Sequence, residues 1–194
     1  MKPVPHTFVV LAAGEAARFG GAPKHLLEVD RETLGARIDR QFPSPVWMTA
    51  DTCPGSRSTC ETFLRSRPHW GEESVTILYG DVYYTDPVAE ALREFTWYLS
   101  FFSDRQDIFA LRVPATFYEE VENAAAKAID TGNNNGRLWE MYRQLHGMKV
   151  TDTVPPPDDR AIRLVSDRTQ DFDEPGEYEE FLEGISKNQL FKDK

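Results

Sequence analysis

The chain has 194 residues, of which 40% are hydrophobic and 12% aromatic. These values exclude a disordered chain and allow the core of one compact domain. The 22 basic and 32 acidic side chains give a formal charge of −10. Nucleic acids and anionic membranes attract the opposite charge, so we expect neither as a partner.

The N-terminal apolar run FVVLAA is too short to span a bilayer, and no signal-peptide cleavage pattern follows it. Cys53 and Cys60 form no C-x-x-C arrangement and belong to no histidine–cysteine cluster. We therefore expect two free thiols in a reducing compartment, and a cytoplasmic protein.

Strands and helices are predicted to alternate along the chain. Apolar, β-rich runs predict strands at residues 6–14, 45–50, 74–81, 107–113 and 161–167. Helical spacing of apolar residues predicts helices at 32–42, 58–66, 85–95, 116–130, 137–147 and 174–185. The alternation indicates one α/β domain, residues 1–186, a three-layer sandwich with a mostly parallel central sheet. We expect residues 187–194 to be a frayed tail.

The third predicted helix has the clearest start signals. Asp86 is expected to be its N-cap, and Pro87 suits the first turn. Val88, Leu92 and Phe95 follow at helical spacing and are expected to face the core.

The loop after the first predicted strand combines small residues with two cations. Ala12, Ala13 and Gly14 leave the main chain open to close approach, and successive N–H groups in such a loop form an anion-binding concavity. Arg18 and Lys24 could neutralise a polyphosphate there, at the edge where open α/β sheets bind ligands. The loop is neither a G-x-G-x-x-G fingerprint nor a P-loop. The alternative is an ordinary connection with two solvated cations.

Three segments in order resemble one family. LAAGEAARFGGAPKHLLEV is similar to the signature of the MobA-like nucleotidyltransferases, within the superfamily of sugar-phosphate nucleotidylyltransferases. VTILYGDVYYTD resembles the family's middle strand with its Gly-Asp, and DFDEPGEYEEF resembles its late acidic segment. The sequence departs from the family pattern at Ala16, where the signature has a second glycine, and the chain is short for this group.

The resemblance implies a Rossmann-like fold of the GT-A type. It also implies transfer of a nucleoside monophosphate from a nucleoside triphosphate to a small phosphorylated acceptor, such as a sugar phosphate, with release of pyrophosphate. Arg18 and Lys24 would bind the triphosphate, and Lys24 would offset charge at the α-phosphate. The nucleobase and ribose would lie against Leu11, Ala12, Ala13 and Gly14.

By the same resemblance Mg²⁺ is the cofactor, bound by Asp81 and Asp173, and the catalytic residues are Lys24, Arg18 and Asp81. Asp171 is the alternative second carboxylate. Without such a role, Asp81 would be a turn residue after a strand, and Asp173 a helix N-cap.

Two other functions remain open. A glycosyltransferase of the GT-A type would use a nucleotide-sugar and usually carries D-x-D after its middle strand, where this chain has GDVY. A non-catalytic nucleotide-binding protein could have kept the fold. The stretch TGNNNG at 131–136 is either a turn or a set of amides for a sugar acceptor.

Overall fold

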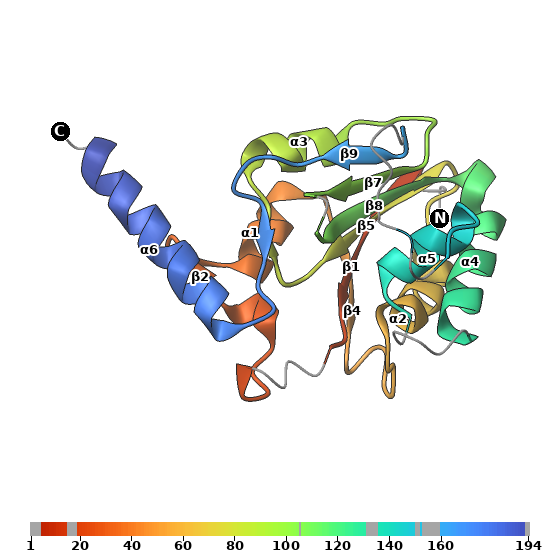
Figure 1. Ribbon diagram of the computed structural model, residues 1–194, viewed down its shortest axis with the longest axis horizontal. Coiled ribbons are helices and arrows are strands. Elements are labelled where there is room, and N and C mark those ends of the chain that lie inside the picture. Colours follow the sequence, from red (N-terminus) through yellow and green to blue (C-terminus); the bar gives the residue numbers. More distant parts are fainter. Residues whose placement is uncertain are drawn as a thin grey trace.

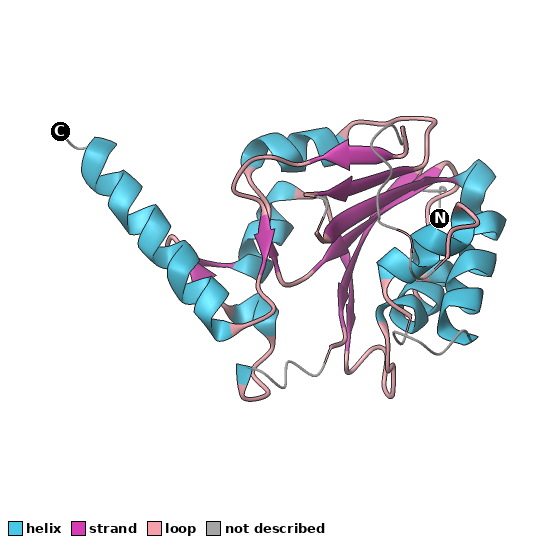
Figure 2. Cartoon of the chain, in the orientation of Figure 1, coloured by secondary structure: helices cyan, strands magenta, loops and turns pink. Residues whose placement is uncertain are grey.

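A six-stranded sheet forms the centre of the molecule in the computed structural model, which describes residues 5–14, 19–104, 106–130, 136–149, 152 and 160–192. Its strands lie in the order β4-β1-β5-β8-β7-β9 (Figures 1 and 2). Their bounds are β1 His6–Ala12, β4 Val46–Thr49, β5 Ser74–Tyr79, β7 Ser100–Ser103, β8 Ile108–Pro114 and β9 Ile162–Leu164. Five strands run in the same direction, and β8 alone runs antiparallel to both of its neighbours, β5 and β7. The predicted mostly parallel sheet is confirmed.

Helices cover both faces of this sheet, as the alternation predicts. The side chains of β1 alternate: Val9 and Leu11 join one core cluster, and Phe8 and Val10 join the other. Helices α2, α4 and α5 close the first cluster, and α1 and α3 close the second. These helices span α1 Leu34–Gln41, α2 Thr59–Arg65, α3 Asp86–Arg93, α4 Tyr118–Asp130 and α5 Leu138–Leu145.

A smaller cluster attaches the C-terminal helix, α6 (Pro175–Lys192), beside the sheet. Its members include Phe172, which is fully buried, and Tyr83, whose ring lies 5.0 Å from that of Phe181 on α6. Two short antiparallel pairs frame this cluster: β2 (Glu28–Val29) with β3 (Glu32–Thr33), and β6 (Val82–Tyr83) with β10 (Gln170–Asp171). Beyond the cluster α6 projects from the body (Figure 1).

Several predicted boundaries are wrong. Helix α3 ends at Arg93, so Phe95 lies outside it and is 42% exposed rather than buried. Thr85, not Asp86, is the N-cap of this helix, whereas Pro87 lies in its first turn as predicted. Strand β7 was not predicted. Helix α6 continues to Lys192, beyond its predicted end, although the domain boundary at residue 186 stays a prediction.

Both cysteines are buried free thiols, in agreement with the prediction. Burial is the main reason that the pKa of Cys60 rises to about 12, so its thiol stays protonated near neutral pH. No helix in the described part of the chain has the length and apolarity to cross a membrane.

Candidate active site

Lys24 lies between two carboxylates that are distant in sequence. Its Nζ donates to Oδ2 of Asp81 at 2.9 Å and to Oδ1 of Asp173 at 3.3 Å. The two acids are 57 and 149 residues from it along the chain. The three side chains predicted to surround one ligand therefore meet in the fold.

Close packing at the ends of β1 and β5 places the first of these acids. Asp81 follows Gly80, whose N–H donates to the Leu11 carbonyl at 3.0 Å. A Cβ on Gly80 would lie 2.9 Å from the Cβ of Ala12 and 3.2 Å from the Trp47 ring, which is too close for another residue. The Gly-Asp turn thus lies directly against the main chain of Leu11 and Ala12.

Tyr84 holds the far side of the same turn. Its hydroxyl accepts from the N–H of Tyr79 at 2.9 Å and donates to the carbonyl of Phe109 at 2.6 Å. Its carbonyl accepts from Arg37 Nε at 2.8 Å and Gln41 Nε2 at 3.1 Å. The turn is anchored to two strands and to α1, which fixes the direction of its carboxylate.

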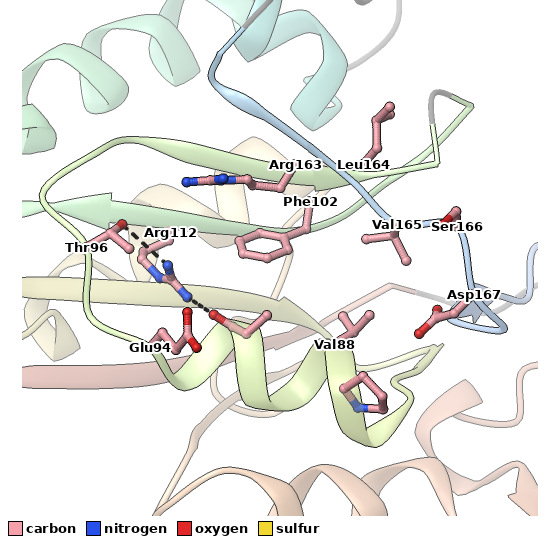
Figure 3. A pocket seen from close by; sticks show the side chains of 12 residues that line it. Val88, Glu94, Thr96, Phe102, Arg112, Arg163, Leu164, Val165, Ser166 and Asp167 are labelled. Atoms are coloured by element: carbon pink, nitrogen blue, oxygen red, sulfur yellow. Dashed lines mark hydrogen bonds between the residues drawn. The ribbon is translucent and has the colours of Figure 1, made fainter.

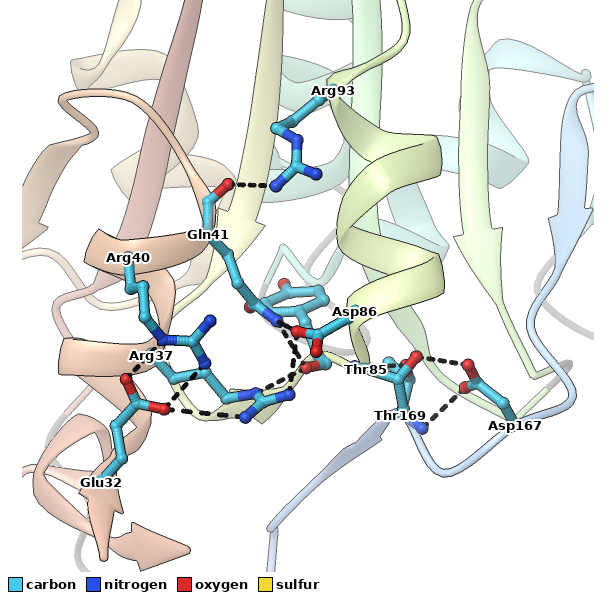
Figure 4. Close-up of polar contacts among 10 residues, drawn as sticks. Glu32, Arg37, Arg40, Gln41, Thr85, Asp86, Arg93, Asp167 and Thr169 are labelled. Atoms are coloured by element: carbon cyan, nitrogen blue, oxygen red, sulfur yellow. Dashed lines mark hydrogen bonds and ion pairs between the residues drawn. The ribbon is translucent and has the colours of Figure 1, made fainter. Parts of the chain in front are cut away.

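A second set of polar contacts ties β10 to the start of α3 (Figure 4). The hydroxyl of Thr85 donates to Asp167, and Oδ1 of Asp167 accepts from the N–H of Thr169 at 2.8 Å. Asp86 accepts from Gln41 at 2.8 Å, and this hydrogen bond is the main reason that the pKa of Asp86 is lowered. The segment that leads to the C-terminal acids is held to the same framework as the Gly-Asp turn.

Side chains alternate in direction along Asp171, Phe172 and Asp173, and this alternation places the Asp173 carboxylate near Lys24. β10 pairs with β6 so that Asp171 lies opposite Val82, and Phe172 turns into the core. The carboxylate of Glu177 accepts from the N–H groups of Asp173 and Glu174 at 2.8 and 2.9 Å. Glu177 thus satisfies two donors just before α6, and the Asp173 side chain contacts Lys24.

The site is rich in negative charge. Burial, followed by the charges of Asp107, Asp81 and Asp173, raises the pKa of Asp171 to about 7. Asp107 has a raised pKa for the same reasons: burial first, then the charges of Asp104 and Asp173. Asp107 was not predicted as a site residue. It immediately precedes β8, and since β8 is antiparallel its first residue lies at the carboxyl ends of the other strands.

Lys24 stays charged in these surroundings. Burial acts to lower its pKa, but the charges of Asp81 and Asp173 and their hydrogen bonds outweigh that effect, and the pKa is raised. The Lys24 side chain is 16% exposed, against 31% for Asp81 and 55% for Asp173. The ammonium is therefore enclosed, while the carboxylates reach solvent.

The donor set suits a magnesium ion completed by a substrate. Two carboxylates converge on one cation, and Mg²⁺ is usually held by one or two carboxylates together with waters and phosphate oxygens. Among the described residues, no group of three or more His, Cys, Asp or Glu side chains is arranged to hold a metal by itself. Asp81 and Asp173 therefore fit a metal that arrives with a phosphorylated ligand.

The structure describes some of the remaining predicted site residues but not all of them. Leu11 and Ala13 are buried with their side chains in the core, Ala12 is half-buried, and Gly14 is exposed at the end of β1. A ligand at this point would meet main-chain groups rather than side chains. Arg18 and residues 131–135 lie outside the described residues.

The fold has solved counterparts among nucleotide-processing enzymes. An inositol-1-phosphate CTP transferase from T. maritima superposes with a TM-score of 0.56 at 12% identity, over 92% of this chain and 95% of that one. A CTP:phosphocholine cytidylyltransferase from Streptococcus pneumoniae gives 0.56 at 14% identity over 94% and 100%. A nucleoside-diphosphate-sugar pyrophosphorylase from Vibrio cholerae RC9 gives 0.57 at 16% identity over 90% and 99%.

At these identities the superpositions establish a shared fold. No model of a protein family and no curated protein sequence matches this chain. Each superposition covers at least 90% of this chain and at least 95% of the counterpart, so the similarity is not limited to one part of the sheet.

Proposed function

We propose that this chain is a magnesium-dependent nucleotidyltransferase that moves a nucleoside monophosphate from a nucleoside triphosphate to a small phosphorylated acceptor, releasing pyrophosphate. The observation that carries the proposal is the position of Lys24, 2.9 Å from Asp81 and 3.3 Å from Asp173, at the carboxyl ends of β1 and β5. The three solved counterparts support it, because their names specify CTP transfer, cytidylyl transfer and nucleotide-sugar pyrophosphorolysis.

The chemistry requires alignment and charge stabilisation more than covalent help from the protein. An acceptor oxygen attacks the α-phosphorus of the triphosphate, and the bond to the pyrophosphate oxygen breaks. Bound Mg²⁺ would neutralise phosphate oxygens, with Asp81 and Asp173 as its protein ligands. Lys24 would then donate to an α-phosphate oxygen, where negative charge builds up in the transition state.

In the structure Lys24 is paired with Asp81 and Asp173. If these carboxylates bind Mg²⁺ in the substrate complex, Lys24 must change partners. Lys24 exchanges two carboxylates for phosphate oxygens, which keeps a buried cation paired throughout. In the proposed complex the main chain of Leu11, Ala12, Ala13 and Gly14 holds the nucleobase and ribose. Arg18 binds the triphosphate, as the sequence resemblance to MobA-like enzymes implies.

Two measurements test the proposal. A thermal-shift screen of four nucleoside triphosphates with Mg²⁺ should raise the melting temperature for the preferred one, since a ligand that binds only the folded state stabilises it. Pyrophosphate release should then be followed with inositol 1-phosphate, phosphocholine and glucose 1-phosphate as acceptors. Asp81→Asn should reduce release by about 10²–10³-fold, and the matched control Asp130→Asn, on the exposed end of α4, should not change it.

The same assay separates the alternatives. A glycosyltransferase would consume nucleotide-sugars and release no pyrophosphate from triphosphates. A non-catalytic binding protein would show the thermal shift without turnover of any acceptor. Either result would overturn the proposal.

A further inference from the structure

A cavity lies on the α3 face of the sheet (Figure 3). Its volume is about 390 Å³, within the range of small-molecule sites. Residues from α3, β7, β8 and β9 line it, and neither Lys24 nor the acids that contact it are among them. The cavity is therefore separate from the candidate active site.

One wall holds a buried arginine that no carboxylate of the described residues contacts. Arg112 is 3% exposed. Its Nη2 donates to the carbonyl of Ala91 and its Nη1 to Oγ1 of Thr96 at 3.4 Å, but Nε has no hydrogen-bond partner among the described residues. Among the described residues its hydrogen-bond acceptors are all neutral, so no carboxylate in direct contact offsets its buried charge.

A second arginine strengthens that potential. Arg163, on β9, lines the same cavity with an exposed side chain and makes no ion pair with any described residue. Burial lowers the pKa of Arg112 to about 10, and the nearby charge of Arg163 acts in the same direction while Glu94 acts against it. Glu94 is the counter-charge at this end of the cavity, but it forms no ion pair with Arg112 in the described structure.

The rest of the lining is mixed, with apolar side chains beside the hydroxyl groups of Thr96 and Ser166 and the carboxylate of Asp167. Val88, Phe102 and Val165 are each at least nine-tenths buried and present hydrocarbon to the cavity. In Figure 3 the two guanidinium groups and Glu94 lie toward one end, and Val165 and Val88 lie toward the other. The cavity thus has two guanidinium groups with one carboxylate, Glu94, at one end, and an apolar wall with the Asp167 carboxylate at the other.

We propose that this cavity binds a small organic anion, a carboxylate or phosphate monoester with an apolar body. Its anionic group would contact Arg163 and lie within the field of Arg112, and its body would cover Phe102 and the two valines. Binding would supply the negative charge that Arg112 lacks. The proposal does not depend on the proposed transferase activity.

The test is a titration of the full-length protein with benzoate, phenyl phosphate and inorganic phosphate, followed by amide chemical shifts. Saturable shifts at Val165, Ser166 and Phe102 are expected for at least one aromatic anion at concentrations up to about 10 mM. Benzoate and phenyl phosphate distinguish carboxylate from phosphate recognition, and inorganic phosphate reports binding without an apolar body.

Charge variants make the test specific. Arg163→Gln should weaken binding about tenfold, the scale of one charge-assisted hydrogen bond. Glu94→Gln should tighten it about threefold, because it removes the competing negative charge. Arg160→Gln, an exposed arginine just before β9 that does not line the cavity, is the matched control and should bind like the unaltered protein.

Three outcomes would overturn the proposal. They are no saturable shift with any probe, shifts confined to residues around Lys24, or equal affinity in Arg163→Gln and the unaltered protein. Because Arg163 is exposed, its replacement leaves the fold intact, and lost binding would not reflect unfolding.

Discussion

Two enclosed cations in this protein are neutralised in opposite ways. Lys24 contacts two carboxylates, at 2.9 and 3.3 Å, that reach solvent and can be released to another partner. Arg112 is more deeply buried and is bound by a carbonyl and a hydroxyl, with no carboxylate in contact among the described residues. The first arrangement suits exchange during the proposed reaction, and the second suits a structural contact beside the proposed anion site. Lys24 tolerates enclosure because its ammonium is paired with two carboxylates, whereas Arg112 keeps two hydrogen bonds to neutral acceptors and one unsatisfied Nε.

The largest effect is expected at the carboxylates around Lys24. Asp81→Asn should reduce nucleotidyl transfer by about 10²–10³-fold, the scale for loss of one charge-stabilising group in an active site. The variant keeps the shape of the side chain, so the melting temperature should change little. Pyrophosphate release measured with the preferred triphosphate and acceptor checks it. Undiminished activity would remove this carboxylate from the catalytic machinery.

Replacement of Arg112 is expected to lower the stability of the protein, whereas replacement of Asp81 is expected to lower its activity. Arg112→Met fills a similar volume but leaves the Ala91 carbonyl near the end of α3 without its donor. We expect the free energy of unfolding to fall by about 1–3 kcal/mol, the cost of a buried polar group left unpaired. Urea denaturation followed by circular dichroism measures it. Arg163→Gln is the comparison variant and should stay within about 0.5 kcal/mol of the unaltered protein.

The burial of His6 near Arg112 predicts that the stability of the protein depends on pH. Burial, with a smaller contribution from the Arg112 charge, lowers the pKa of His6 to about 4. Its ring nitrogens contact Ser74 at 2.5 Å and Thr76 at 3.2 Å. The unfolded chain takes up a proton near pH 6.5 and the folded chain only near pH 4, so stability falls as the pH drops between these values.

The loss should be smaller than about 3.5 kcal/mol, the value that the full shift would give at about 1.4 kcal/mol per pKa unit, because His6 is only partly buried and solvent screens its charge. His6→Gln retains a hydrogen-bonding side chain and should flatten the stability profile between pH 6.5 and 4. Urea midpoints over this range provide the measurement. An unchanged slope in the variant would assign the acid sensitivity to other groups.

Much of this architecture could be read from the sequence, because strongly periodic segments gave the strands and helices that cover the core. Strand β7 was missed: its four residues, SFFS, begin and end with serines that are buried in the structure. Strand direction is not encoded in a local pattern of apolar residues, so the antiparallel course of β8 could not be predicted.

The antiparallel direction of β8 explains why Asp107 was not predicted as a site residue. In a wholly parallel sheet, Asp107 would begin a strand at the edge opposite Lys24. In the actual sheet it lies among the other carboxylates and contributes to the raised pKa of Asp171. Lys24, Asp81 and Asp173 were predicted from their motifs, and the fold brings them together. Their catalytic and metal-binding roles stay predictions.

The smallest expected effect completes the contrast with Arg112. Lys24→Met removes two contacts of an enclosed ammonium, yet we expect the free energy of unfolding to change by less than about 1 kcal/mol. The carboxylates it leaves behind are partly solvated, and water and salt screen their repulsion.

Lys127→Met, on the exposed face of α4, is the matched control. Urea denaturation at low and high salt should show a slightly larger loss at low salt, where repulsion between Asp81 and Asp173 is less screened. A loss as large as that of Arg112→Met would mean that the Lys24 contacts hold the fold together, and would weaken the view that this lysine is free to change partners during the reaction.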